Sequence, residues 1–302
     1  MKRRDFIKTV GAAGMVSLMG GAPLHAGASS DETPRQVALT GPFDLAWDPT
    51  GNLLVTEPSG YRVVRLDVSC KPISTFGTPG TEIGRLNYPA GITVGPEAAV
   101  YVVDSNNCRL QVFDAKGEVT SVIGSVGSIG GSFATPQGVC VDRKGRILVA
   151  DTRNHRVQIF QGETLIGVIG ELGDDQDQFR LPTAVVVSPD GEILVLDSKH
   201  GQVKAFGEDL TFKRSFGGVG SEPGMLNLPQ GMKIDPQDRI WVADTGNHRI
   251  QVFDLDGKYQ SVIGKLGTGP NEFKSPTGIA FRENKVYVAD NGNGRIQVLP
   301  QT

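Results

Sequence analysis

Short apolar runs alternate with polar turns along almost the whole chain after residue 40. In one representative stretch, strands are expected at residues 232–234, 240–243, 250–253 and 259–263, and glycine- or aspartate-containing turns separate them. Runs this short with turns between them predict β-strands rather than helices. The 40 Gly and 18 Pro among 302 residues agree with a chain that turns often.

An acidic residue ends the second apolar run of each unit. These residues recur 46 or 47 positions apart, at Glu57, Asp104, Asp151, Asp197, Asp244 and Asp290. A period in the forties with four short strands per unit is typical of propeller blades, each blade being one sheet. The predicted fold class is therefore all-β: a six-bladed β-propeller of four-stranded antiparallel blades.

The sixth unit has no fourth strand within its own repeat, because Thr302 comes just after its third strand. Residues Arg35 to Leu39 lie immediately before the first unit. An unpaired sheet edge at this seam would expose backbone donors and acceptors. We therefore predict that this N-terminal strand completes the sixth blade and closes the ring.

Repeated motifs relate the chain to a known family. The tracts Asn154-His155-Arg156-Val157 and Asn247-His248-Arg249-Ile250, a Pro-x-Gly opening and a Val-Ala-Asp strand end recur along the chain. In these motifs the sequence resembles the NHL repeat family over all six units, from about Pro42 to Leu299. The resemblance implies a six-bladed propeller, but this fold carries many activities.

The N-terminal segment is typical of an export signal. Basic residues precede an apolar stretch from Thr9 to Leu24, which leads to small residues at 26–28. The pattern resembles a twin-arginine (Tat) signal through Arg3, Arg4, Phe6 and Lys8, with an ordinary Sec signal as the alternative. The apolar stretch is too short and too rich in glycine for a stable membrane span.

We therefore expect a signal peptide at 1–28, a linker at 29–34 and the propeller at 35–302, in a periplasmic or secreted protein. Removal of residues 1–28 changes the formal net charge from −3 to −6, which disfavours a nucleic-acid partner. Cys70, Cys108 and Cys140 are too few and too scattered for a disulfide framework or a zinc cluster. We interpret Cys108 as a packed turn residue and Cys140 as a core residue, and we expect no cofactor.

The repeated acid is followed five positions later by an arginine. An acid can accept backbone N–H groups of a tight turn, and the arginine can add a charge-assisted bond, so we interpret the pairs as structural. They are Glu57/Arg62, Asp104/Arg109, Asp151/Arg156, Asp244/Arg249 and Asp290/Arg295. The fourth unit breaks this pattern at residues 197–202, where the turn is expected to be looser or rebuilt for another purpose.

Histidines occupy three of these turns, at His155, His200 and His248. A three-histidine metal site is conceivable, but two of the three are repeat-consensus residues, and we predict no metal. A resemblance to peptidyl-amidating lyase would place metal-binding histidines directly after the opening prolines. None of the residues there can replace a histidine ligand, which disfavours lyase activity: they are Phe43, Ala90, Gln137, Thr183, Gln230 and Thr277. We expect these residues, except Ala90, to lie with Asp44 at the channel mouth.

The loops that link the blades and the acid-to-arginine turns are expected on one face, which we call the loop face. Variable loops on a rigid scaffold are frequent binding sites. We predict a non-enzymatic binding or scaffold propeller that recognises a protein, peptide or glycan there, and a co-exported redox partner is one candidate. The candidate residues are Asp174, Asp175, Asp177, Lys199, His200 and Gln202. The alternative is a metal-assisted lactonase, an esterase or a lyase-like enzyme that uses Asp44, Gln137 and Gln230.

Overall fold

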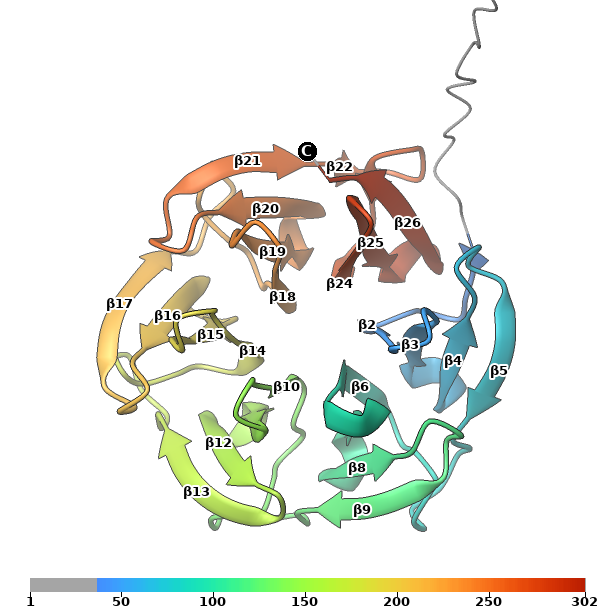
Figure 1. Ribbon diagram of the computed structural model, residues 1–302. Helices are drawn as coiled ribbons and strands as arrows, with labels where there is room; N and C mark the ends of the chain where they lie inside the picture. The colour runs from blue at the N-terminus through green and yellow to red at the C-terminus, as the bar shows by residue number, and fades with distance from the viewer. Residues whose placement is uncertain (1–36, 302) are drawn as a thin grey trace, which may run out of the picture. The chain divides into compact units, whose positions relative to one another are not determined.

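Six four-stranded antiparallel sheets are arranged as blades around a central axis in the computed structural model, which describes residues 37–301 (Figure 1). The fold class predicted from the repeats is confirmed. Within the described part of the chain, the helical residues form only short 3-10 turns, such as Thr152–Asn154 after the second strand of blade three. No described helix has the length and apolar character needed to cross a bilayer.

Each blade runs from an inner strand beside the axis to an outer strand at the rim. Blade one comprises β2 (Leu45–Trp47), β3 (Leu53–Glu57), β4 (Arg62–Leu66) and β5 (Pro72–Phe76), and blade two comprises β6 (Pro89–Val94), β7 (Val100–Asp104), β8 (Arg109–Phe113) and β9 (Val119–Ile123). Blade three comprises β10 (Val139–Val141), β11 (Arg146–Asp151), β12 (Arg156–Gln161) and β13 (Thr164–Ile169).

The second half of the ring follows the same order. Blade four comprises β14 (Pro182–Val187), β15 (Ile193–Asp197), β16 (Gln202–Phe206) and β17 (Phe212–Gly217), and blade five comprises β18 (Gly231–Ile234), β19 (Ile240–Asp244), β20 (Arg249–Phe253) and β21 (Tyr259–Ile263). Blade six comprises β24 (Pro276–Arg282), β25 (Lys285–Asp290), β26 (Arg295–Pro300) and β1 (Val37–Ala38), while β22 (Lys265–Leu266) and β23 (Glu272–Phe273) pair within a linking loop.

The N-terminal strand closes the ring, as predicted. In the antiparallel pairing of β1 with β26, Val37 lies opposite Ile296 and Ala38 opposite Arg295. The Leu39 N–H also donates to the Gly294 carbonyl oxygen at 2.7 Å. Blade six thus obtains its fourth strand from the other end of the chain. The expected export signal at residues 1–28 lies outside the described residues.

The hydrophobic core lies between neighbouring blades. One cluster joins Leu194 and Val203 of blade four to Met232 and Ile240 of blade five. Because side chains of a strand point alternately to the two faces of its sheet, each blade packs against both neighbours. The inner strands of the six blades surround the axis and line the central channel.

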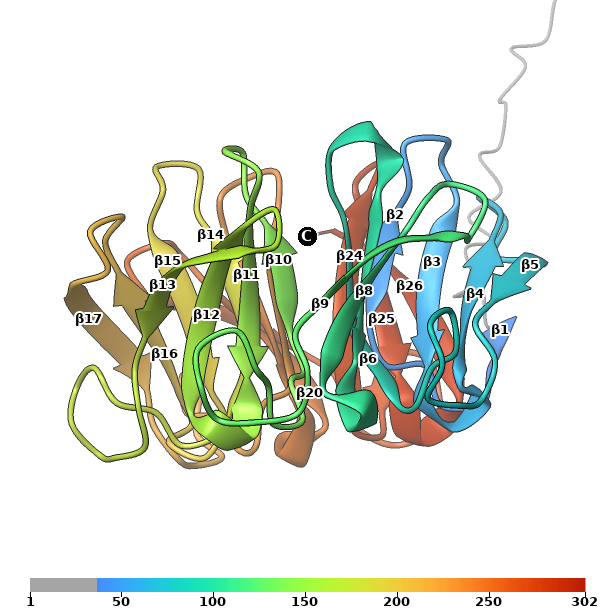
Figure 2. The ribbon, with the colours of Figure 1, turned by 90° about the horizontal axis from the view of Figure 1, so that it is seen from below.

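The two faces of the ring are built from different connections (Figure 2). On the loop face, the linking loops lie against the turns that follow each second strand. In blade two, for example, Arg109 Nη2 donates to the Glu82 and Arg85 carbonyl oxygens of the linking loop at 2.8 and 2.9 Å. The opposite face carries the turns between the inner and second strands, such as 142–146 and 235–239, and we call it the hairpin face.

Candidate functional site

The repeated acid organises each turn on the loop face. In blade three, Asp151 Oδ1 accepts the Ala134 N–H at 2.8 Å, while Oδ2 accepts from Asn154, Arg156 and Gln158 at 2.8, 2.8 and 3.1 Å. The corresponding acid–arginine Nε bonds measure 2.7–2.8 Å in five blades, at Glu57/Arg62, Asp104/Arg109, Asp151/Arg156, Asp244/Arg249 and Asp290/Arg295. These side chains tie the second strand to the linking loop.

Blade four builds the same junction with different side chains. His200 Nδ1 and Lys204 Nζ lie 2.6 and 3.3 Å from Asp197 Oδ2, in the places that asparagine and glutamine occupy elsewhere. The other imidazole nitrogen, Nε2, lies 2.9 Å from Asp174 Oδ1, and Arg180 Nη2 donates to Asp174 Oδ2 at 2.9 Å. The turn is therefore rebuilt rather than loosened.

Hydrogen bonds from Arg180 and His200 lower the pKa of Asp174 to about 2. Asp174 and His200 are thus hydrogen-bonded to other groups of blade four and of its linking loop. Asp175, Asp177 and Lys199 are exposed, and Gln202 is half-buried. None of the six predicted partner residues lines either cavity described below.

The two consensus histidines link neighbouring blades. His155 Nδ1 accepts the Leu181 N–H at 3.1 Å, and His248 Nδ1 accepts the Ser275 N–H at 3.0 Å. Burial lowers the pKa of His155. Among residues 37–301, no three His, Cys, Asp or Glu side chains are grouped so that they could hold a metal ion.

The residues expected at the channel mouth do meet, but around a very small space. Phe43, Asp44, Gln137, Thr183, Gln230 and Thr277 all line a cavity of about 20 Å³. Thr277 Oγ1 donates to the Phe43 carbonyl oxygen at 2.7 Å, and Asp44 Oδ2 accepts the Ile92 N–H at 3.0 Å. A cavity of this size holds about one water molecule, so the channel is nearly closed toward the loop face.

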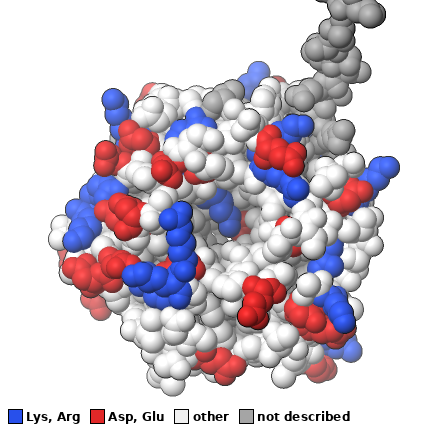
Figure 3. Space-filling model, viewed as in Figure 1, with Lys and Arg blue, Asp and Glu red and all other residues white. Residues whose placement is uncertain are grey.

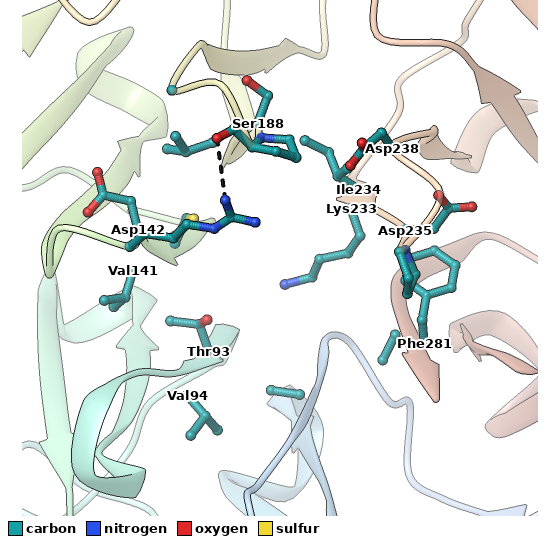
Figure 4. Close-up of a pocket in the computed structure, with 18 of the residues that line it drawn as sticks. Thr93, Val94, Val141, Asp142, Ser188, Lys233, Ile234, Asp235, Asp238 and Phe281 are labelled. Carbon is teal, nitrogen blue, oxygen red and sulfur yellow. Dashed lines mark hydrogen bonds between the residues drawn. The ribbon is translucent and has the colours of Figure 1, made fainter. Parts of the chain in front are cut away.

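A cavity of about 890 Å³ opens on the hairpin face, and the inner strands of all six blades line it. Its rim is formed by turns such as Asp142–Arg146 and Ser188–Gly191. Figure 3 shows this face hollowed at its centre, with basic side chains inside the hollow. Lys233, on β18, extends into the open centre (Figure 4).

The sequence did not predict this cavity, because the repeated turns and opening prolines that mark the blades lie toward the loop face. One signal was present: Lys233 interrupts an apolar strand at a position where the other blades carry small or apolar residues. Cys140 is half-buried: it packs against the core cluster between blades three and four, and it also lines the cavity wall. Cys108 is buried in its turn, as expected.

Most carboxylates around the cavity already have partners within the protein. Asp142 accepts the Arg146 Nε–H at 2.6 Å, and Asp190 accepts from Ser188. Asp235 accepts from Arg239 and from the indole N–H of Trp241, both at 2.8 Å. Although burial opposes ionisation of Asp235, its hydrogen bonds keep the pKa of this carboxyl below its ordinary value.

Comparison with known families identifies the repeats. The NHL repeat model matches residues 86–113, 133–160, 179–206, 226–253 and 273–299. The chain therefore carries NHL repeats in blades two to six, while the diverged first blade is not matched. No curated protein sequence matches the chain significantly.

Solved structures with this fold include both enzymes and binding proteins. A gluconolactonase from Xanthomonas campestris is 16% identical with a TM-score of 0.67, and the alignment covers 88% of this chain and 89% of that one. Virginiamycin B lyase from Staphylococcus aureus is 14% identical, TM-score 0.63, covering 88% and 98%. An auxiliary nutrient binding protein from Bacteroides thetaiotaomicron is 13% identical, TM-score 0.66, covering 88% and 70%. At these identities the likeness concerns the fold alone.

Proposed function

We propose that this protein is a binding propeller that takes a small molecule into the central cavity from the hairpin face. The observation that carries the proposal is the difference between the two ends of the channel. The cavity measures about 890 Å³ on the hairpin side, and only about 20 Å³ remains on the loop side. Ligand pockets typically measure roughly 300–1,000 Å³, and a ligand here would enter and leave at one end.

Filling the cavity tests this function. Thr93 and Ala46 are half-buried wall residues on different inner strands, so Thr93→Trp and Ala46→Trp each introduce bulk without touching the loop face. The protein is incubated with a small-molecule extract of its host cells and examined by native mass spectrometry. Wild type should retain a bound species that both cavity variants lose.

Ser128→Trp, on an exposed loop of the opposite face, is the matched control and should retain the same species. Two cavity variants are used because one of them could fail to fold, which thermal unfolding reports. The proposal is wrong if wild type retains nothing, or if the folded cavity variants retain as much as wild type.

We also propose that the loop face docks a protein or peptide partner, because exposed aliphatic side chains repeat on it. The third residue of four successive linking loops is exposed by 78%, 59%, 69% and 62%, at Val126, Leu172, Val219 and Leu266. A partner that binds across several of these loops would bury these side chains, and burial of apolar surface favours association.

Export completes the proposal and depends on the sequence alone, since Arg3 and Arg4 lie outside the described residues. A periplasmic location would be reached through the Tat route. Replacement of both arginines by lysine should abolish periplasmic accumulation in cell fractionation, and unchanged accumulation would exclude this route.

A further inference from the structure

Lys233 occupies a position where the other five blades have no charge. The strand register identifies its equivalents, because each lies opposite the residue three positions before the repeated acid. The equivalents are Ala46, Thr93, Cys140, Val186 and Ala280. The fold is therefore built five times without a lysine at this point.

The lysine also has no structural role of the kind found elsewhere in the ring. The side chain of Lys233 is half-buried and forms no hydrogen bond or ion pair with any residue from 37 to 301, whereas the buried Lys204 ammonium pairs with Asp197. It is the residue that lines both the large and the small cavity, which places it at their junction. An ammonium group partly removed from water without a partner costs free energy.

Two further cations line the cavity with incomplete hydrogen bonding, and the neutral indole N–H of Trp47 is also buried there without a hydrogen-bond partner among residues 37–301. Arg143 Nη1 makes one long bond of 3.4 Å to the Pro189 carbonyl oxygen (Figure 4). Arg146 Nη2 is buried without a hydrogen bond and lies 3.9 Å from Glu208, which pairs with Lys144. Among the described lining carboxylates, that of Asp238 forms no described hydrogen bond, and this exposed residue lies at the outer rim.

The walls between these groups are apolar. Val94, Val141, Ile234 and Phe281 come from four different inner strands or their ends and line the cavity around the lysine. Apolar walls with a few placed polar groups suit a ligand with an apolar body and one polar head. A single ammonium matches a singly charged head, because lysine acts as a compact point charge.

We infer that the cavity binds a small organic acid, with its carboxylate at Lys233 Nζ and its apolar body against these walls. This inference rests on the proposed small-molecule function and adds the chemical class of the ligand. The carboxylate supplies the acceptor that Lys233 lacks, and Arg143 adds positive potential at the entrance.

A series of ligands with one common chain tests the inference. Octanoate, octyl phosphate, 1-octanol and octylammonium are titrated into the protein by isothermal calorimetry. Octanoate should bind at least about tenfold more tightly than 1-octanol, since a charge-assisted hydrogen bond contributes about 1.5–3 kcal/mol. Octylammonium should bind more weakly than 1-octanol.

Lys233→Met keeps the length of the side chain and removes the charge, so octanoate affinity should fall about tenfold while 1-octanol affinity stays unchanged. Lys233→Arg should retain most of the preference for octanoate. Lys274→Met, the same change at an exposed position in a linking loop of the loop face, should alter the affinity of neither ligand.

Equal affinity for octanoate and 1-octanol would overturn the inference about charge, yet the proposed cavity function would stand if Thr93→Trp abolished binding of both. Tighter binding of octyl phosphate than octanoate would overturn the carboxylate assignment. Failure of all four ligands to bind would also overturn the inference, and the host-extract experiment would still decide whether the cavity takes a ligand.

Discussion

At the scale of single residues, one carboxylate holds together each junction between a blade and its linking loop. Asp151 is fully buried, and its side chain accepts four hydrogen bonds from the backbone, asparagine, arginine and glutamine. An ionised carboxylate only accepts, so it suits a place where every neighbour donates. An amide there would turn an N–H toward donors.

Asp151→Asn should therefore destabilise the propeller by about 3–5 kcal/mol, the cost of leaving a buried charge without its partner. Chemical denaturation of wild type and variant measures the difference in free energy of unfolding. Asp256→Asn, at an exposed position, is the matched control and should change stability by no more than about 0.5 kcal/mol. Equal stability of the two variants would contradict the structural role.

The acidic loop of blade four gives a pH-dependent prediction. Hydrogen bonds from Arg180 and His200 lower the pKa of Asp174 from 3.8 to about 2. A lowered pKa means that ionised Asp174 stabilises the fold fully above its ordinary value, and that this contribution is lost as the pH falls through about 2.

Carbon-13 NMR titration of the Asp174 carboxyl should give a midpoint near 2 in wild type and a higher one in Arg180→Gln. Arg153→Gln removes an exposed arginine of another blade and should leave the midpoint where it is. The assignment fails if both variants titrate like wild type.

Residue-scale prediction from sequence succeeded where a pattern repeats and failed where one residue departs from it inside a strand. The spacing of Asp151 and Arg156 was enough to propose a turn pair. Lys233 departs from its equivalents in the other blades, but this departure is a weak signal, because a lysine between Met232 and Ile234 also resembles ordinary strand alternation. The register sets it opposite Trp241 on the inner strand, and its place in the lining of both cavities shows that it belongs to the channel.

At the scale of elements, the repeat period predicted every blade because the units share the same order of short strands, four in the first five units and three in the sixth. The closing strand was predictable for a related reason, since the sixth unit lacked a partner for β26. The structure pairs β1 with β26 through only two residues, followed by the bond from Leu39 to Gly294. Because so few backbone hydrogen bonds hold β1 to β26, the loss of any of them should weaken closure of the ring.

Deletion of residues 35–39 should lower stability by about 3 kcal/mol, because roughly three backbone hydrogen bonds are lost at about 1 kcal/mol each. For a domain of this size, that corresponds to a fall in Tm of about 6–12 °C. Differential scanning calorimetry of the full-length and deleted proteins measures it. An unchanged Tm would mean that the ring does not depend on this strand.

At the scale of the whole molecule, the two faces are suited to different ligands. The hairpin face contains the cavity, whereas the loop face presents exposed aliphatic and acidic side chains above a channel that is nearly closed. Sequence reasoning located the loop face through its variable loops. It could not locate the cavity, because the width of the channel depends on how six inner strands pack around one axis.

The last prediction concerns the partner of the loop face, and the contacts in blade four decide which aspartates can be replaced to test it. Asp174 is engaged with Arg180 and His200, so its replacement would disturb the blade itself. Asp175 and Asp177 are exposed, and Asp175→Ser with Asp177→Ser changes the surface charge without breaking that network.

In a pull-down with quantitative mass spectrometry, this double variant should capture a basic partner about fivefold less well at low salt, since two rim charges contribute about 1 kcal/mol. The difference should shrink above physiological ionic strength, because added salt screens exposed charges over about 8 Å or less. Glu118→Ser with Asp256→Ser removes the same charge from outer turns and should not affect capture. If both double variants recover the partner equally, these two aspartates do not form its binding site.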